Sequence, residues 1–108
     1  MLIRLFCNVG MSTSVLVEKM NAAAREKGKN DQVESYAISE LADYAKGSDI
    51  VLLGPQVGFK LEDSRKICEP LGVPCEVIPS KEYGMVDGMA VLKFAHMTVK
   101  KYKKDNGG

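Results

Sequence analysis

The chain has 108 residues, of which 45% are hydrophobic and 27% charged, and its formal net charge is +1 at pH 7. These values predict one globular domain with its own core, and they exclude the basic surface typical of a nucleic-acid-binding protein. No run approaches the ~18 consecutive apolar residues of a membrane span, and the first residues lack the regions of a signal peptide. We therefore expect a cytoplasmic protein without direct membrane insertion.

The first half of the chain predicts strands and helices in alternation. The expected elements are a strand at residues 2–6, a helix at 14–27, a strand of mixed polarity at 33–38 and a short helix at 39–46. Gly28 and Gly47 are plausible helix stops, and Ser39 is the expected N-cap of the short helix.

The second half continues the alternation. Its expected elements are an apolar strand at residues 49–54, a helix at 60–69, a strand at 75–78 between two prolines and a helix at 86–103. The order predicts a single three-layer α/β domain over residues 1–104, with a four-stranded parallel sheet in the order 2-1-3-4 and helices on both faces. Such a domain is flavodoxin-like and resembles the low-molecular-weight cysteine phosphatases. Residues 105–108 are expected to form a frayed tail.

In this strand order the loops after Phe6 and Gly54 meet at a switch point, where ligands bind. The first loop opens with Cys7 and runs through Gly10 to three hydroxyl residues and a helix N-terminus. Backbone N–H groups in such a loop attract negative charge and favour the thiolate, the nucleophilic form of cysteine. The alternative is a buried structural cysteine followed by an ordinary Ser/Thr helix cap.

Other chemistries lack their motifs. A cysteine phosphatase would read C-x5-R, but Thr13 holds the arginine position, and no Asp-Pro pair supplies an acid. There is neither a nucleotide-binding glycine loop nor a dinucleotide fingerprint, so no cofactor is expected. The three cysteines form no CxxC and His96 is the only histidine, so we expect no metal site. A site that takes phosphate and hydrolyses it poorly suits a phosphocarrier; a non-catalytic module that kept the fold remains the other alternative.

Three segments carry a resemblance to a known family. Residues 5–14 (LFCNVGMSTS) are similar to the signature L-F-C-x-x-G-M-S-T-S, residues 52–57 (LLGPQV) to L-L-G-P-Q-[IV], and residues 83–88 (YGMVDG) to Y-G-x-x-D-G. With these segments in order, the chain resembles the IIB component of the lactose/cellobiose/chitobiose family of the bacterial phosphoenolpyruvate-dependent sugar phosphotransferase system.

The resemblance implies a function and a site. Cys7 would accept a phosphoryl group from phosphohistidine of a IIA protein and pass it to a sugar, a disaccharide of the cellobiose/chitobiose/lactose class, imported by a membrane IIC component. The implied phosphate-binding residues are Asn8, Val9, Gly10, Met11, Ser12, Thr13 and Ser14. The sugar itself stays open, because selectivity in these systems lies mainly in IIC.

Four further residues have two interpretations each. Gln56 either touches the phosphate or a docked partner, or is a loop residue without a role. Tyr83 is a possible rim residue, although we interpret it, with Asp87, as structural, since Asp87-Gly88 suits a turn or helix start. His96 could relay phosphate, but its place beside an apolar helical stripe favours a packed or half-exposed side chain. We also expect the apolar loop residues Val9, Met11, Val57 and Phe59 to surround an exposed Cys7; the alternative is that these side chains pack inward beneath the loops.

Overall fold

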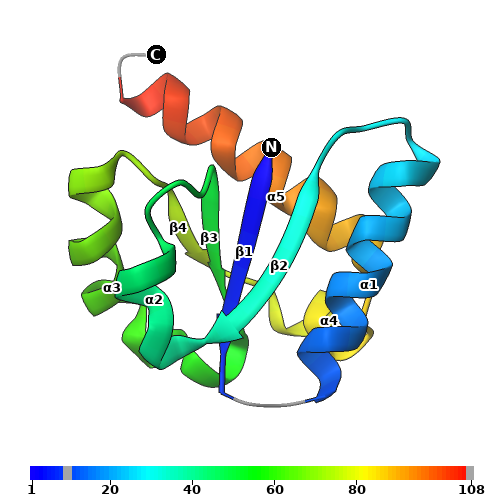
Figure 1. Ribbon diagram of the computed structural model, residues 1–108, viewed down its shortest axis with the longest axis horizontal. Coiled ribbons are helices and arrows are strands. Elements are labelled where there is room, and N and C mark those ends of the chain that lie inside the picture. The colour runs from blue at the N-terminus through cyan, green and yellow to red at the C-terminus, as the bar shows by residue number, and fades with distance from the viewer. Residues whose placement is uncertain (9–10, 107–108) are drawn as a thin grey trace.

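Four parallel strands form the centre of the molecule in the order β2-β1-β3-β4, which confirms the predicted sheet (Figure 1). They are β1 (Leu2–Cys7), β2 (Gln32–Ala37), β3 (Ile50–Leu53) and β4 (Cys75–Val77). The computed structural model describes residues 1–8 and 11–106, and of residues 11 and 12 the backbone alone. The expected phosphate-loop residues Val9 and Gly10 and the last two residues of the expected tail lie outside this range.

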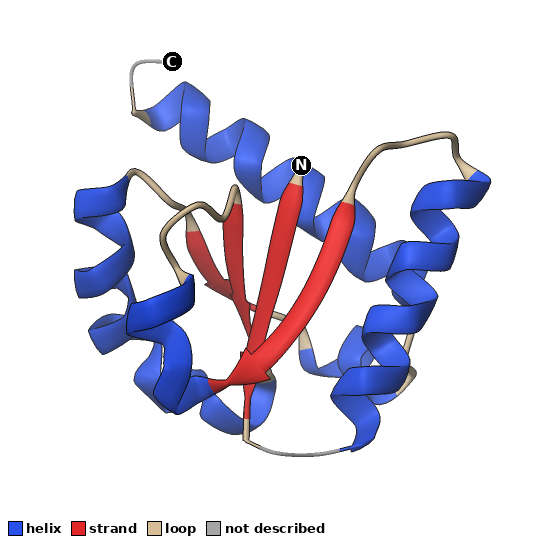
Figure 2. Ribbon diagram, in the orientation of Figure 1, coloured by secondary structure: helices blue, strands red, loops and turns tan. Residues whose placement is uncertain are grey.

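Helices cover both faces of the sheet (Figure 2). The α-helices are α1 (Met11–Glu26), α2 (Leu41–Tyr44), α3 (Leu61–Cys68), α4 (Ser80–Gly84) and α5 (Gly88–Asp105), and short 3₁₀ helices span Ile38–Glu40, Pro55–Lys60 and Glu69–Leu71. Helices α1 and α5 pack on one face and α2 and α3 on the other. Within the described part of the chain, none of these helices has the length and apolar character needed to cross a bilayer.

The two cores follow from the alternation of side chains along a strand. Ile3 and Leu5 of β1 point to the α1/α5 face, whereas Phe6 points to the α2/α3 face. All four residues of β3 are buried, as its continuous apolar run predicts for a central parallel strand. Cys7 follows Phe6, so its side chain returns to the α1/α5 face.

Three local expectations were wrong. Helix α1 begins at Met11 rather than residue 14, so the hydroxyl residues lie in its first turn. Ser39 is not an N-cap, because it lies inside a 3₁₀ helix whose start is closed by Glu40 accepting from the Ala37 N–H at 3.3 Å. Helix α4 was not expected at all, since a five-residue segment is too short to show a period.

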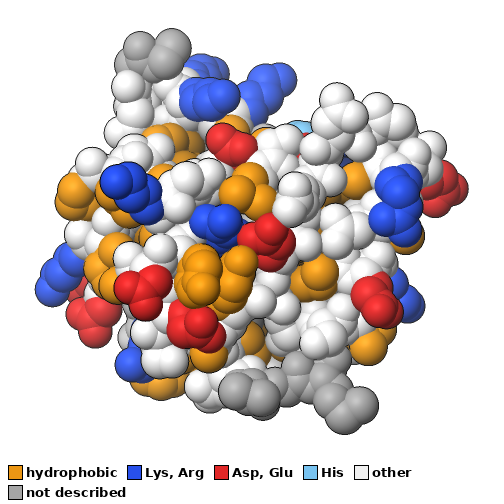
Figure 3. Space-filling model, viewed as in Figure 1, with side chains coloured by type: hydrophobic (Ala, Val, Ile, Leu, Met, Phe, Trp, Pro, Cys, Tyr) orange, Lys and Arg blue, Asp and Glu red, His pale blue; other side chains and the backbone are white. Residues whose placement is uncertain are grey.

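Charge is mixed on the face that Figure 3 shows. Acidic and basic side chains alternate across it, and basic ones gather only near the C-terminal end of α5. Lysines there oppose the negative end of the helix dipole. This end of α5 is remote from the carboxyl ends of the strands, so the lysines lie away from Cys7 (Figure 1).

Gly88 allows α1 and α5 to approach closely. A Cβ built at Gly88 would lie 2.5 Å from the Lys19 carbonyl carbon and 2.8 Å from its oxygen. Both atoms belong to the backbone and cannot turn aside. We therefore expect Gly88→Ala to lower the free energy of unfolding by about 1–3 kcal/mol, measured by chemical denaturation.

Gly84→Ala is the matched control for Gly88→Ala. A Cβ at Gly84 meets nothing within 4 Å, and the residue lies at the end of α4 with no positive φ. Its replacement should leave stability unchanged or slightly raised. Equal effects of the two substitutions would contradict the steric explanation.

Asp31 joins the N-terminus to α5. Its side chain is 4% exposed; it accepts from the Met1 ammonium at 2.9 Å and lies 2.6 Å from His96 Nε2. Burial raises the pKa of Asp31, but the hydrogen bonds and charges of His96 and the ammonium outweigh burial and place this pKa below its ordinary value of 3.8. Asp31 therefore stabilises the fold above pH 3.8, and this contribution is lost as the pH falls through the lower folded pKa.

The test is Asp31→Asn, which keeps the shape and removes the charge. At neutral pH it should lower the free energy of unfolding by about 1–3 kcal/mol, because it leaves the ammonium and His96 without an anionic partner. The difference from wild type should shrink as the pH falls below 3.8. Asp43→Asn, at an exposed position of α2, is the control. A difference that stays constant down to low pH would contradict this account.

Candidate functional site

Cys7 lies where the two expected loops meet. It is the last residue of β1, paired with Ala37 of β2, and the Gly54 N–H donates to the Phe6 carbonyl at 2.9 Å. The carboxyl end of β1 thus faces both the first turn of α1 and the loop that follows β3. Contrary to the expected exposed thiol, Cys7 is only 5% exposed.

Two polar side chains contact the Cys7 sulfur. The Tyr83 hydroxyl and Gln56 Oε1 each lie 3.6 Å from Sγ, within hydrogen-bonding distance for sulfur. The Tyr83 hydroxyl also lies 2.7 Å from Thr13 Oγ1, a side chain that is buried in the first turn of α1. Segments from three regions of the sequence therefore converge on one sulfur atom.

The absence of a side chain at Gly54 makes space for the Cys7 sulfur. A Cβ there would lie 2.9 Å from Cys7 Sγ and 2.9 Å from Gln56 Oε1. Its backbone, with φ −62° and ψ 148°, is open to any residue, so the requirement for glycine is steric rather than conformational.

On its other side Cys7 borders an open hollow of about 280 Å³. Its lining consists of Cys7, Asn8, Thr13, Ser14, Ser35, Tyr36, Ala37 and Glu40. At the α1 side of the hollow lie the hydroxyl residues Thr13 and Ser14, where the helix N-terminus favours a negative charge, and the Glu40 carboxylate on the other side accepts from the Ala37 N–H. A thiolate at Cys7 can therefore meet an anionic electrophile from the α1 side.

The structure sorts the expected site residues. Gln56 and Tyr83 contact Cys7, and Asn8 and Ser14 line the hollow. Asp87 instead caps α5 by accepting from the Ala90 N–H at 3.0 Å, as its helix-start interpretation predicts. Nothing is described of the side chains of residues 9–12, so their part in the site stays a prediction.

Two expected neighbours of Cys7 lie elsewhere. Val57 is fully buried in the α2/α3 core, so the expectation that it surrounds Cys7 was wrong. His96 bonds to Asp31 beside Met1, at the opposite end of β1, which its length places roughly 20 Å from Cys7. This position agrees with a half-exposed structural histidine.

The contact between Thr13 and Tyr83 had no signal in the sequence. Thr13 was expected as one of three equivalent hydroxyls, and Tyr83 was interpreted mainly as structural. Only the folded chain brings together these two hydroxyls, which lie 70 positions apart in sequence.

The other two cysteines are poor nucleophiles. Cys68 and Cys75 are buried in the α2/α3 core, and neither forms a disulfide. The hydrogen bond between them lowers the pKa of Cys68 and, together with burial, raises the pKa of Cys75. Cys68 is 0% exposed, so it is burial rather than its pKa that keeps this thiol from reagents. Across residues 1–8 and 11–106, no three His, Cys, Asp or Glu side chains are grouped in a way that could hold a metal ion.

A parallel sheet in this order, with a cysteine ending its first strand and a helix starting just beyond, defines a flavodoxin-like domain with a cysteine at its switch point. Residues 2–94 match the family described as "PTS system, Lactose/Cellobiose specific IIB subunit". The chain belongs to this family of sugar phosphotransferase system components.

Relatives span most of the chain. It is 41% identical over 98 residues to the galactose-specific EIIB component of Lactococcus lactis subsp. cremoris, covering 86% of this chain and 91% of that protein. It is 40% identical, with the same coverage, to the cellobiose-specific EIIB component of Lactococcus lactis subsp. lactis. The solution structure of a cellobiose-specific IIB component from Borrelia burgdorferi is similar, with a TM-score of 0.77, 35% identity and 94% of each chain covered.

Proposed function

We propose that this chain is a phosphocarrier whose Cys7 accepts a phosphoryl group from phosphohistidine of a IIA protein and transfers it to a sugar carried by a membrane IIC component. The observation that carries the proposal is the position of the Cys7 sulfur. It lies at the end of β1, against the first turn of α1, with hydrogen-bonding groups on one side and an open hollow on the other.

The thiolate would attack phosphorus while the bond between phosphorus and the imidazole nitrogen breaks, and that nitrogen keeps the electron pair. In the second step the bond between sulfur and phosphorus breaks, the pair returns to sulfur, and the sugar hydroxyl oxygen takes the phosphoryl group as its proton leaves to solvent or the partner. Such transfers need nearly in-line geometry and charge stabilisation more than covalent help. The hollow beside Cys7 is where the donor would approach.

The position of the arginines supports a carrier over a phosphatase. Arg4 is paired with Glu34, Arg65 with Glu76, and Arg25 lies in the last turn of α1, far from its N-terminus. Since these are the chain's three arginines, none of them clamps a phosphoryl group at Cys7 as a phosphatase arginine would. The phosphocysteine would then hydrolyse slowly enough to reach its acceptor.

The family and its relatives support a sugar substrate of the cellobiose/lactose class and a place of action in the cytoplasm, where a IIA donor and the inner side of IIC meet. The relatives described above are named for galactose and for cellobiose. We expect the IIC partner to determine which sugar receives the phosphoryl group from this chain.

The experiment is intact-mass measurement after mixing the protein with a phosphorylated IIA protein. We expect a gain of one phosphoryl group, located on Cys7 by sequencing the modified peptide. Phosphate on His96 or on a serine would contradict the proposal. Rapid turnover of an aryl phosphate by the free protein would instead identify a phosphatase.

A further inference from the structure

Tyr83 is the buried neighbour of the reacting sulfur. Its side chain is part of the core between the sheet, α1 and α5, and the residue is 8% exposed. The Tyr83 N–H donates to the Pro79 carbonyl at 3.0 Å, which anchors α4 directly after β4. The backbone of Tyr83 is thus fixed by α4, and its hydroxyl lies 3.6 Å from Cys7 Sγ.

The hydrogen count at this hydroxyl limits what it can do. A phenol has one proton to donate, and two groups lie within hydrogen-bonding distance of the Tyr83 oxygen, Thr13 Oγ1 at 2.7 Å and Cys7 Sγ at 3.6 Å. When Cys7 is a thiol, its S–H can donate to Gln56 Oε1, and Tyr83 is free to donate to Thr13. When Cys7 is a thiolate it can only accept, so the phenol must turn its proton to sulfur, and Thr13 then donates to Tyr83.

We propose that Tyr83 is a catalytic residue of the phosphoryl transfer, which donates its O–H to the Cys7 sulfur whenever that sulfur carries negative charge. Thr13 is the positioning residue that fills the acceptor side of the same phenol. The proposal rests on the function proposed above, because it assigns the charge on Cys7 to the two transfer steps.

The Tyr83 hydroxyl stabilises the thiolate in both transfer steps. Before the phosphoryl group arrives, it stabilises and orients the thiolate; as the group leaves for the sugar, it stabilises the thiolate that receives the electron pair of the broken bond. No proton is transferred, so Tyr83 ends each step as it began. Burial raises the pKa of Tyr83, so its hydroxyl stays protonated and able to donate at neutral pH.

Gln56 does not replace Tyr83 in this role. It is exposed, it lies in the loop after β3, and the atom that faces Sγ in the structure is its carbonyl oxygen, which cannot donate. To help a thiolate, its amide must first turn over. Tyr83 needs only a rotation of its own O–H bond.

The test compares Tyr83→Phe with wild type in two assays. The first is the rate of phosphorylation by a phosphorylated IIA protein. The second is the rate at which iodoacetamide alkylates Cys7 at fixed pH, located by peptide mass, which reports thiolate reactivity without any partner. We expect both rates to fall by about 10- to 100-fold, the effect of one hydrogen bond to a charged group.

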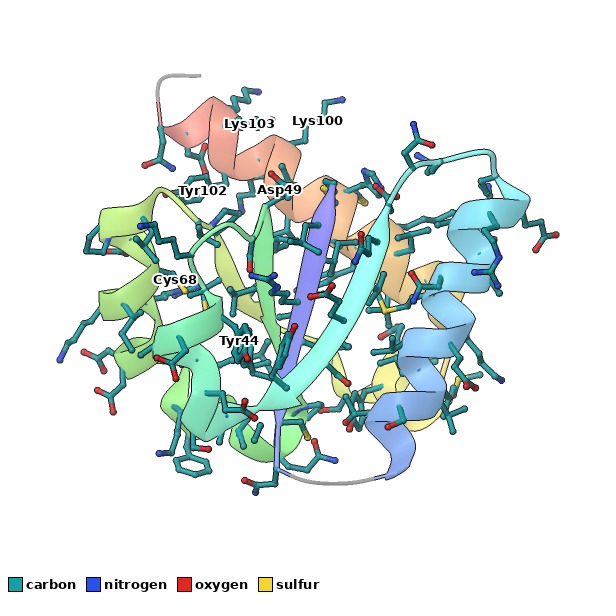
Figure 4. The ribbon with its side chains drawn as sticks, viewed as in Figure 1. Tyr44, Asp49, Cys68, Lys100, Tyr102 and Lys103 are labelled. Carbon is teal, nitrogen blue, oxygen red and sulfur yellow. The ribbon has the colours of Figure 1, made fainter. Side chains whose placement is uncertain are left out.

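Two controls separate this role from folding. Tyr44→Phe and Tyr102→Phe remove the same hydroxyl from α2 and from the far end of α5, as Figure 4 shows, and should change neither rate. Thr13→Val keeps the phenol and removes its partner, so it should slow both reactions by a smaller factor. If the Tyr83→Phe protein does not fold, the Thr13→Val protein provides the test in its place.

The outcomes distinguish the two proposals. If the Tyr83→Phe protein folds like wild type and both of its rates are unchanged, the proposed role of Tyr83 is overturned. If the IIA protein phosphorylates no variant, wild type included, the proposed function fails, while slower alkylation of Tyr83→Phe still supports the donor. If wild type is phosphorylated and alkylation alone is unaffected, Tyr83 does not act on the thiolate.

Discussion

Cys7→Ser should abolish formation of the phosphorylated protein while leaving the fold in place. A serine hydroxyl is a weak nucleophile unless a base removes its proton, and the groups at Cys7 are a phenol and an amide, not a base. The new hydroxyl fits the same space and finds the same two partners. After mixing with a phosphorylated IIA protein, intact-mass measurement should detect no phosphorylated Cys7→Ser protein. The thermal unfolding temperature should change little.

Cys68→Ser is the matched control for this loss. It makes the same chemical change at a cysteine that is fully buried in the α2/α3 core. It should lower stability, since the new hydroxyl enters an apolar site, yet leave phosphorylation intact. Phosphate on the Cys7→Ser protein, or its loss from the Cys68→Ser protein, would show that Cys7 is not the acceptor.

The sequence was sufficient for the sheet because its signals are local. The apolar run of β3, the prolines around β4 and the alternation of strands with helices fix the element order, and chirality then limits the topology. Cys7 is predicted as the reacting residue for the same reason: a thiol between a strand and a helix start is visible in eight consecutive residues.

The groups around the sulfur depend on tertiary packing and were only partly predictable. Tyr83 reaches Cys7 across 76 positions of sequence, through a helix too short to show a period. Gln56 and Val57 are neighbours in sequence, yet one faces the sulfur and the other is buried on the opposite face of the sheet. The path of the 3₁₀ helix after Gly54 determines that Gln56 faces the sulfur and that Val57 enters the α2/α3 core.

Gly54 directly follows β3 and lies beside the Cys7 sulfur. In sequence it reads as the first half of a Gly-Pro loop, a position where any turn residue would serve. In the structure its φ of −62° gives glycine no conformational advantage, and its missing side chain is what makes space for Cys7 and Gln56. The structure therefore separates two explanations that the sequence alone cannot.

Gly54→Ala should slow phosphoryl transfer by about 10²-fold or more, because a small displacement of a reacting atom has effects of that size. The new methyl would lie 2.9 Å from Cys7 Sγ, closer than real contacts of this kind, so the sulfur must move or rotate from its present position. The measurement is the rate of phosphorylation by a phosphorylated IIA protein, together with iodoacetamide alkylation of Cys7.

Gly58→Ala, in the same 3₁₀ helix, is the control for this substitution. A Cβ at Gly58 would meet only the methyl groups of Val77, at 3.6 and 3.7 Å, which is ordinary contact. It should leave both rates near the wild-type values. Because Gly54→Ala moves the sulfur without removing any group, its two rates should fall together, whereas a substitution that harmed only partner docking would slow phosphorylation and spare alkylation. An unchanged alkylation rate in Gly54→Ala would therefore show that the sulfur keeps its place and that the glycine is not required for it.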